Sequence, residues 1–71
     1  MKVKYKCFMK LDSLLKGIRF RGFYSEGTKE WCYQGIVEAN DLVAEGDYDQ
    51  ALILLQKVED VYYTEYLANV A

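Results

Sequence analysis

Residues 2–11 alternate between apolar and mostly polar side chains. Between Lys2 and Leu11 every second residue is apolar, and lysine fills four of the five positions between them. A period of two is typical of a strand with one buried face. We therefore expect a strand here. Its inward side is predicted to carry Val3, Tyr5, Cys7, Met9 and Leu11.

A second extended segment, IRFRGFYS at residues 18–25, repeats this alternation. Gly22 breaks the pattern as a β-bulge would, which is expected to let Phe23 or Tyr24 return to the core. The connection between the two strands is longer than a two-residue turn, and we expect a positive φ at Gly17. The two segments are predicted to pair as an antiparallel β-hairpin.

From residue 28 onward the apolar spacing changes to that of helices. Thr28 is the expected N-cap of a helix over residues 28–45, which Gly46 ends. Asp47 is expected to cap a second helix over residues 48–67. The buried arc of the first helix is predicted to contain Trp31, Cys32, Gly35, Ile36, Ala39, Leu42 and Val43. That of the second is predicted to contain Tyr48, Ala51, Leu52, Leu54, Leu55, Val58, Val61, Tyr62 and Tyr66.

The predicted order is β-β-α-α, an α+β fold. An N-terminal antiparallel β-hairpin would pack on a C-terminal antiparallel helical hairpin, because a two-residue connection forces two helices to run antiparallel. A chain of 71 residues has room for a single domain, residues 1–71. Its composition is 52% apolar with seven tyrosines. This is more apolar material than so small a monomer can bury, so we expect part of it to contact a partner or a second copy.

The segment EGDYDQALILLQKVEDV, residues 45–61, resembles the turn and second helix of a tetratricopeptide repeat. Its GDYDQA is close to the family's usual GDYDEA, and Trp31, Tyr33 and Gly35 resemble the start of the repeat's first helix. The resemblance covers residues 30–62 and implies protein binding without catalytic residues. Convergent packing of two helices is the alternative, because repeats of this kind stack in arrays and only one unit is present here.

Charge divides the chain into two halves. Residues 1–29 hold eight basic and two acidic residues, whereas residues 30–71 hold one lysine and nine acidic residues. Spacings of four, four, three and four align acidic positions and Gln34 on one side of the first predicted helix. We expect this line, continued past the turn, to bind a basic surface of a partner protein; a merely solvated face is the alternative. The residues concerned are Glu30, Glu38, Asp41, Glu45, Asp47 and Asp49.

The outward side of the predicted β-hairpin is basic and includes one phenylalanine. A ring among cations is typical of single-stranded nucleic-acid binders, in which the ring stacks on a base and the cations contact phosphates. An edge strand protected by lysines against aggregation is the favoured alternative, because the acidic half would repel the same polyanion. Nucleic acid is therefore not the expected partner. The candidate residues are Lys2, Lys4, Lys6, Phe8, Lys10, Arg19 and Arg21.

Several large apolar residues fall at the margins of the predicted buried arcs or outside them. The run VYYTEYL places three tyrosines within five positions of the second helix, and interfaces are enriched in tyrosine. We therefore predict a homodimer through this helix, or a partner site there. The candidate residues are Trp31, Ile53, Tyr63 and Leu67, with Tyr33 and Val37 on the rear of the first helix.

Catalytic chemistry has little to build on. The chain has no histidine, so it can form no metal site of a common type and no histidine-based triad. Its glycines are single, so there is no phosphate-binding loop. Cys7 and Cys32 are expected to be reduced and buried in a cytoplasmic protein. No metal or cofactor is expected.

The start of the chain lacks the unbroken apolar run of a signal peptide, and no stretch is apolar enough to span a membrane. Small size, acidic balance and many tyrosines together resemble the small inhibitors and adaptors encoded by phages and mobile elements. The sequence therefore predicts a small non-enzymatic binding protein that covers a basic surface of its partner, which could itself be a nucleic-acid-binding surface. A single-stranded nucleic-acid-binding module is the alternative.

Overall fold

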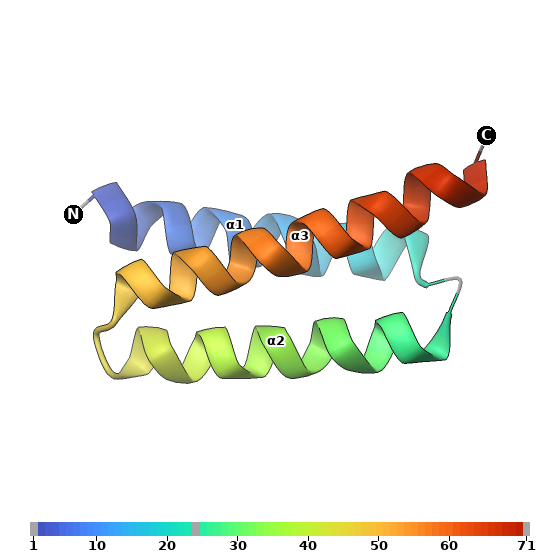
Figure 1. Ribbon diagram of the computed structural model, residues 1–71. Coiled ribbons are helices and arrows are strands. Elements are labelled where there is room, and N and C mark those ends of the chain that lie inside the picture. Colours follow the sequence, from blue (N-terminus) through green and yellow to red (C-terminus); the bar gives the residue numbers. More distant parts are fainter. Residues whose placement is uncertain (1, 24, 71) are drawn as a thin grey trace.

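The computed structural model describes residues 2–23 and 25–70, with the side chains of residues 3–23 and 25–69. These residues form three helices, α1 (Lys2–Arg21), α2 (Glu26–Ala44) and α3 (Tyr48–Val70), and no strand occurs among them. The chain reverses direction at each connection, so α1 and α3 run the same way and α2 runs between them in the opposite direction (Figure 1). The fold is an all-α three-helix bundle.

The predicted N-terminal β-hairpin, and with it the α+β fold class, is wrong. The side chains that α1 turns inward recur at helical spacing: Val3, Cys7, Leu11, Leu14 and Ile18. The first three of these positions satisfy a period of two as well as a helical period, because they are four residues apart. The two positions that only a strand would bury, Tyr5 and Met9, are 66% and 54% exposed.

The ends of the first two helices also differ from the prediction. Gly17 lies inside α1, whereas Gly22 has the positive φ of 69° and ends this helix, with its N–H donating to the carbonyl of Ile18 at 2.8 Å. Ser25, and not Thr28, is the N-cap of α2; its hydroxyl accepts from the Thr28 N–H at 3.4 Å.

The residues expected to return to the core beyond the predicted bulge have separate outcomes. Phe23 packs against the core, as predicted, although it does so from the connection between α1 and α2. Tyr24 lies outside the described residues.

The helical hairpin of α2 and α3 is confirmed. Gly46 follows α2 with a φ of 84°, a conformation that costs glycine little. The next residue, Asp47, accepts the N–H of Gln50 at 3.3 Å and so caps α3 as predicted. This turn reverses the chain within three residues and fixes the antiparallel packing of the two helices.

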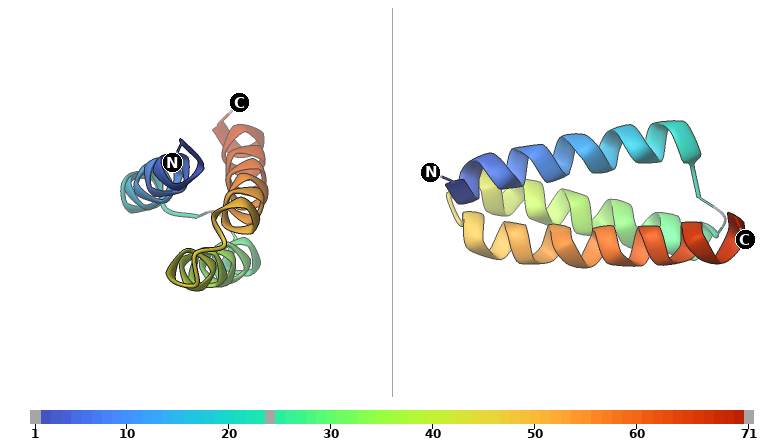
Figure 2. Two further views of the ribbon diagram at one scale, coloured as in Figure 1. Left: turned by 90° about the vertical axis from the view of Figure 1, so that its left-hand side faces the viewer. Right: turned by 90° about the horizontal axis from the view of Figure 1, so that it is seen from above.

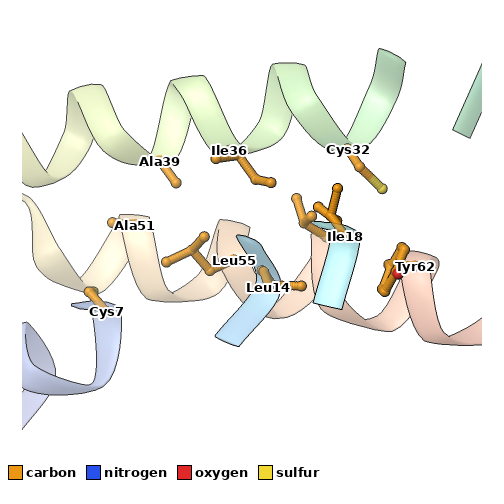
Figure 3. Packing of buried hydrophobic residues seen from close by; sticks show 10 residues of the cluster. Cys7, Leu14, Ile18, Cys32, Ile36, Ala39, Ala51, Leu55 and Tyr62 are labelled. Carbon is orange, nitrogen blue, oxygen red and sulfur yellow. The ribbon is translucent and has the colours of Figure 1, made fainter. Parts of the chain in front are cut away.

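α3 is the central helix, since it packs along both α2 and α1, whereas α1 and α2 meet only sparsely (Figure 2). It approaches α2 closely at Gly35, where a Cβ atom would lie 2.5 Å from Cγ2 of Val58. The missing side chain of Gly35 thus leaves room for Val58. The buried core (Figure 3) consists of Cys7, Leu14, Ile18, Cys32, Ile36, Ala39, Ala51, Leu55, Val58 and Tyr62.

Three polar contacts hold α1 against α3. The thiol of Cys7 donates to the carbonyl of Tyr48 at 3.2 Å, and the ammonium of Lys10 pairs with Glu59 at 3.0 Å. The hydroxyl of Tyr62 donates to the carbonyl of Gly17 at 3.0 Å. Because these contacts are spread along α1, they fix its position lengthwise on α3.

Candidate interaction surfaces

The acidic surface lies on the outer side of α2. We use this name for Glu30, Gln34, Glu38, Asp41 and Glu45, which are all exposed. Within the part of the chain that the structure describes, none of these carboxylates forms an ion pair; the pairs found there are Lys10–Glu59 and Lys16–Asp12. The sequence thus predicted the exposure and the alignment of the line correctly.

The two aspartates beyond the turn belong to the acidic surface less clearly. Asp47 is exposed, but its carboxylate already caps α3 by accepting the Gln50 N–H. Asp49 is exposed in the first turn of α3, where its charge contributes to the raised pKa of the Cys7 thiol. Asp49 is therefore exposed to solvent and also influences the Cys7 thiol on α1.

Trp31 lies beside the acidic surface and not in the core. Its side chain is 46% exposed, and it borders an open hollow of about 250 Å³ together with Gln34, Gly35, Glu38 and Leu54. The hollow lies where α2 meets α3. It combines an aromatic ring with a carboxylate, and these are the two groups that attract a guanidinium most strongly.

The other apolar candidates do not form one patch with Trp31. Ile53 and Leu67 are exposed on α3, more than half of each side chain being accessible. Tyr63 is half-buried; its ring meets that of Tyr62 at a centroid distance of 5.4 Å, and the guanidinium of Arg21 lies 5.4 Å above it. Tyr63 thus helps to hold α1 on α3.

The predicted basic surface is divided by the helical geometry of α1. Lys10 is half-buried in its pair with Glu59, and Arg21 lies 4.7 Å above the ring of Tyr66. Every second residue of a helix is rotated by about 200°, so these alternate positions cannot share the single face that a strand would have given them. The exposed members that remain are Lys4, Lys6, Phe8 and Arg19; the side chain of Lys2 lies outside the described residues.

The strand prediction also hid an apolar surface on the side of the bundle away from α3. On a helix whose buried positions are 3, 7, 11, 14 and 18, the aromatic and aliphatic residues between them must face outward. Recognising the helical period would have revealed this surface. The exposed residues are Tyr5, Phe8 and Leu15 on α1 with Tyr33 and Val37 on α2, while Met9 and Phe20 lie farther around α1.

The titratable groups of the core stay protonated at neutral pH. Burial raises the pKa of both thiols, Cys7 and Cys32, with smaller contributions from the charges of Asp49 and Glu65 respectively. Burial also raises the pKa of the Tyr62 hydroxyl. Both cysteines are free and buried, as predicted, and a thiol held protonated is a poor nucleophile and a poor metal ligand.

The described residues contain no group of three or more metal-ligating side chains that could hold an ion. None of the three helices is long and apolar enough to cross a membrane, over the residues described.

Comparison of this chain with protein-family models, with curated proteins and with solved structures finds no match.

Proposed function

We propose that this protein is a small non-enzymatic binding protein whose acidic surface, together with Trp31, contacts a basic surface of a partner protein. The observation that carries the proposal is the line of exposed carboxylates on α2, unpaired among the described side chains, beside a half-exposed tryptophan. Covering a basic surface would make the protein an inhibitor or adaptor, and a nucleic-acid-binding surface is a natural target for a row of negative charges.

The charge state of the free protein favours such a contact. A partner's arginine or lysine that reaches Glu38 or Asp41 would break no ion pair among the described side chains, so no such pair is lost to offset the Coulomb attraction. An arginine placed over Trp31 would add a cation–π contact of about 0.5–2 kcal/mol. Tryptophan is also among the residues that contribute most to binding energy at interfaces.

Trp31 provides the test, because it is the only tryptophan of the chain and its fluorescence reports on this surface alone. An arginine-rich helical peptide serves as the probe, titrated at low and at physiological ionic strength. We expect a saturable change in Trp31 emission that weakens with salt. The variant Glu38→Gln should reduce the affinity about threefold to tenfold, since it removes one charge adjacent to the ring.

Asp60→Asn is the matched control. Asp60 is exposed on α3, where its carboxylate accepts from Gln56, so this variant loses the same charge at a residue that does not line the hollow of Trp31 and Glu38. Equal weakening by both variants would mean that only net charge attracts the peptide, which would contradict a defined surface. The native partner should then be captured by the wild type and by Asp60→Asn but not by Glu38→Lys.

Binding to nucleic acid is the competing outcome. Salt-sensitive retention of labelled single-stranded DNA, lost in the variant Arg19→Glu, would favour the alternative module built on Lys4, Phe8 and Arg19. We expect no such retention, because Lys10 and Arg21 are occupied by contacts with α3 and the chain carries a net charge of −2.

A further inference from the structure

The side of the bundle opposite α3 is apolar and has no cover. We call it the α1/α2 face and define it by Tyr5, Phe8, Leu15, Tyr33 and Val37. These side chains are 41–66% exposed. α1 and α2 meet only sparsely, so neither helix shields the apolar residues of the other. The end view in Figure 2 shows both helices bordering this side, with α3 on the opposite side of the bundle.

The charges that border this face differ between its two helices. α1 contributes Lys16 and Arg19, and α2 contributes Glu30 and Asp41, all exposed. Lys16 makes a highly exposed pair with Asp12 at 3.0 Å, which at a surface is worth little. The border is thus mainly cationic on α1, where Asp12 is paired with Lys16, and mainly anionic on α2, where Lys29 is an exception beside Tyr33.

We propose that the α1/α2 face binds the same face of a second copy of the chain, with α1 of each copy lying on α2 of the other. A twofold axis parallel to the helices produces this arrangement, and both copies then use the same surface. It places the cationic border of each copy against the anionic border of the other. Pairing α1 with α1 would instead bring lysines and arginines together, which costs free energy.

The heights of the residues along the bundle agree with this pairing. α1 and α2 are antiparallel and joined at residues 22–25, so residues equally far from that turn lie at similar heights. Leu15 is thus level with Tyr33, and Arg19 is close to the level of Glu30. An axis parallel to the helices preserves height, so Leu15 meets Tyr33 of the second copy, and Arg19 and Lys16 both lie near its Glu30. Asp41 is ten residues farther from the turn than Lys16, about 15 Å along the bundle, and does not take part in this pairing.

The area available is that of a modest dimer. The bundle measures 38 × 20 × 17 Å, so a face two helices wide can bury at most about 1,500 Å² over both copies. This lies within the range of specific interfaces of standard size, toward the lower end once the rounded edges are subtracted. A dissociation constant in the micromolar range is therefore expected. The dimer would leave Glu38 and both copies of Trp31 outside the interface. It would share Glu30 and Asp41 with the acidic surface, so a second copy and a foreign partner would compete for these two residues.

Sedimentation equilibrium over a wide range of concentrations provides the first test. We expect the wild type to change from monomer to dimer, and Val37→Glu to weaken dimerisation about 100-fold or more, because two carboxylates would be buried without partners. Val37 is exposed in the monomer, so this variant should keep its helical circular dichroism. The matched control is Ile53→Glu, which places the same charge on an equally exposed position of α3 and should dimerise like the wild type.

A charge exchange tests the pairing itself. Arg19→Glu and Glu30→Arg should each weaken dimerisation at low ionic strength by at least about tenfold, since each puts two like-charged pairs into the dimer. An equimolar mixture of the two variants should form a heterodimer, because both of its pairs are again opposite in sign. Only contacts between different copies give this result.

Three outcomes would overturn the proposal. The first is a wild type that remains monomeric at millimolar concentration, which would leave the face to a foreign protein or an anionic membrane. The second is dimerisation that Ile53→Glu abolishes and Val37→Glu does not, which would place the interface on α3. The third is a mixture of Arg19→Glu and Glu30→Arg that associates no better than either variant alone.

Discussion

The two sides of α2 show opposite kinds of packing. Toward α3 the helix presents small residues, and Gly35 lets Val58 approach so closely that a methyl group would not fit. Toward α1 the same helix presents Tyr33 and Val37, which remain largely exposed, and few contacts are made. The chain itself covers the side of α2 that faces α3, whereas the side with Tyr33 and Val37 stays exposed.

The difference shows how a very small bundle can use one set of residues for stability and another set for binding. Close packing of α2 on α3 around Ala39 and Ala51, both fully buried, provides the dense contacts that a chain of this length needs. The open side leaves apolar area that can be buried only against another molecule. Substitutions on the two sides should therefore affect different measurements, the free energy of unfolding on one and association on the other.

The largest effect is expected where all three helices meet. Leu55→Ala removes a fully buried side chain of α3 and should lower the free energy of unfolding by about 2–5 kcal/mol, enough to unfold much of the protein at 25 °C. Leu15→Ala makes the same chemical change on the open side and should cost less than about 1 kcal/mol in the dilute monomer. Urea unfolding followed by circular dichroism measures both; equal losses would refute the contrast between the two sides.

A smaller but more specific effect is expected at the close contact between Gly35 of α2 and Val58 of α3. Gly35→Ala should lower the free energy of unfolding by about 1–2 kcal/mol, because the clash with Val58 outweighs the roughly 1 kcal/mol that alanine gains in a helix. Gly27→Ala is the control, since its Cβ would meet only the Ser25 hydroxyl at 3.7 Å. Thermal unfolding of both variants decides the matter: stabilisation by Gly35→Ala would show that α2 and α3 lie farther apart.

The connection between α1 and α2 and the connection between α2 and α3 should respond alike to substitution of their glycines, although the two helix pairs differ in how closely they pack. Gly22 and Gly46 have φ angles of 69° and 84°, so alanine at either should cost about 1–2 kcal/mol of unfolding free energy. Asparagine at the same positions should cost less, because it tolerates this conformation better. Melting temperatures of the four variants test this; a harmless Gly22→Ala would mean that α1 ends differently from the structure described.

The smallest effect is a loss of stability at alkaline pH. Burial raises the pKa of Cys7, Cys32 and Tyr62 above ordinary values of 9.0 for the thiols and 10.0 for the phenol. The unfolded chain therefore loses these protons first, so the contribution of these three groups to stability is constant below about pH 8 and falls as the pH rises through 9 and 10. Urea unfolding at pH 7 and pH 10 should show the decrease, and Cys32→Ala should reduce it; an unchanged pH dependence in that variant would contradict burial of the thiol.

The helical hairpin could be predicted from sequence because its signals agree with one another. Gly46, Asp47 and the apolar spacing on both sides of them all indicate a helix, a tight turn and another helix. The N-terminal third could not be assigned in this way, since positions 3, 7 and 11 fit a strand and a helix equally well. The deciding positions were Leu14 and Ile18, which continue the series only at helical spacing. Leu14 lies in the stretch interpreted as a loop, and Ile18 begins the stretch interpreted as the second strand.

The candidate surfaces depend on that assignment to different degrees. The acidic line on α2 was found because its helix was correctly predicted, whereas the basic surface was drawn on a strand and is divided by the actual helix. The exposure of Tyr5 and Leu15 was missed for the same reason. How α1 packs against α2 depends on long-range contacts with α3, and spacing along a single helix carries no information about them.

The contrast between the two sides of α2 can be tested most directly by nuclear Overhauser effects in a concentrated equimolar mixture of ¹³C-labelled and unlabelled protein. We predict contacts between Gly35 and the Val58 methyl groups only within a chain, and contacts between the Val37 methyl groups and the Phe8 ring only between chains. Intermolecular contacts to Val58, or a Val37 that contacts no second copy, would contradict the account.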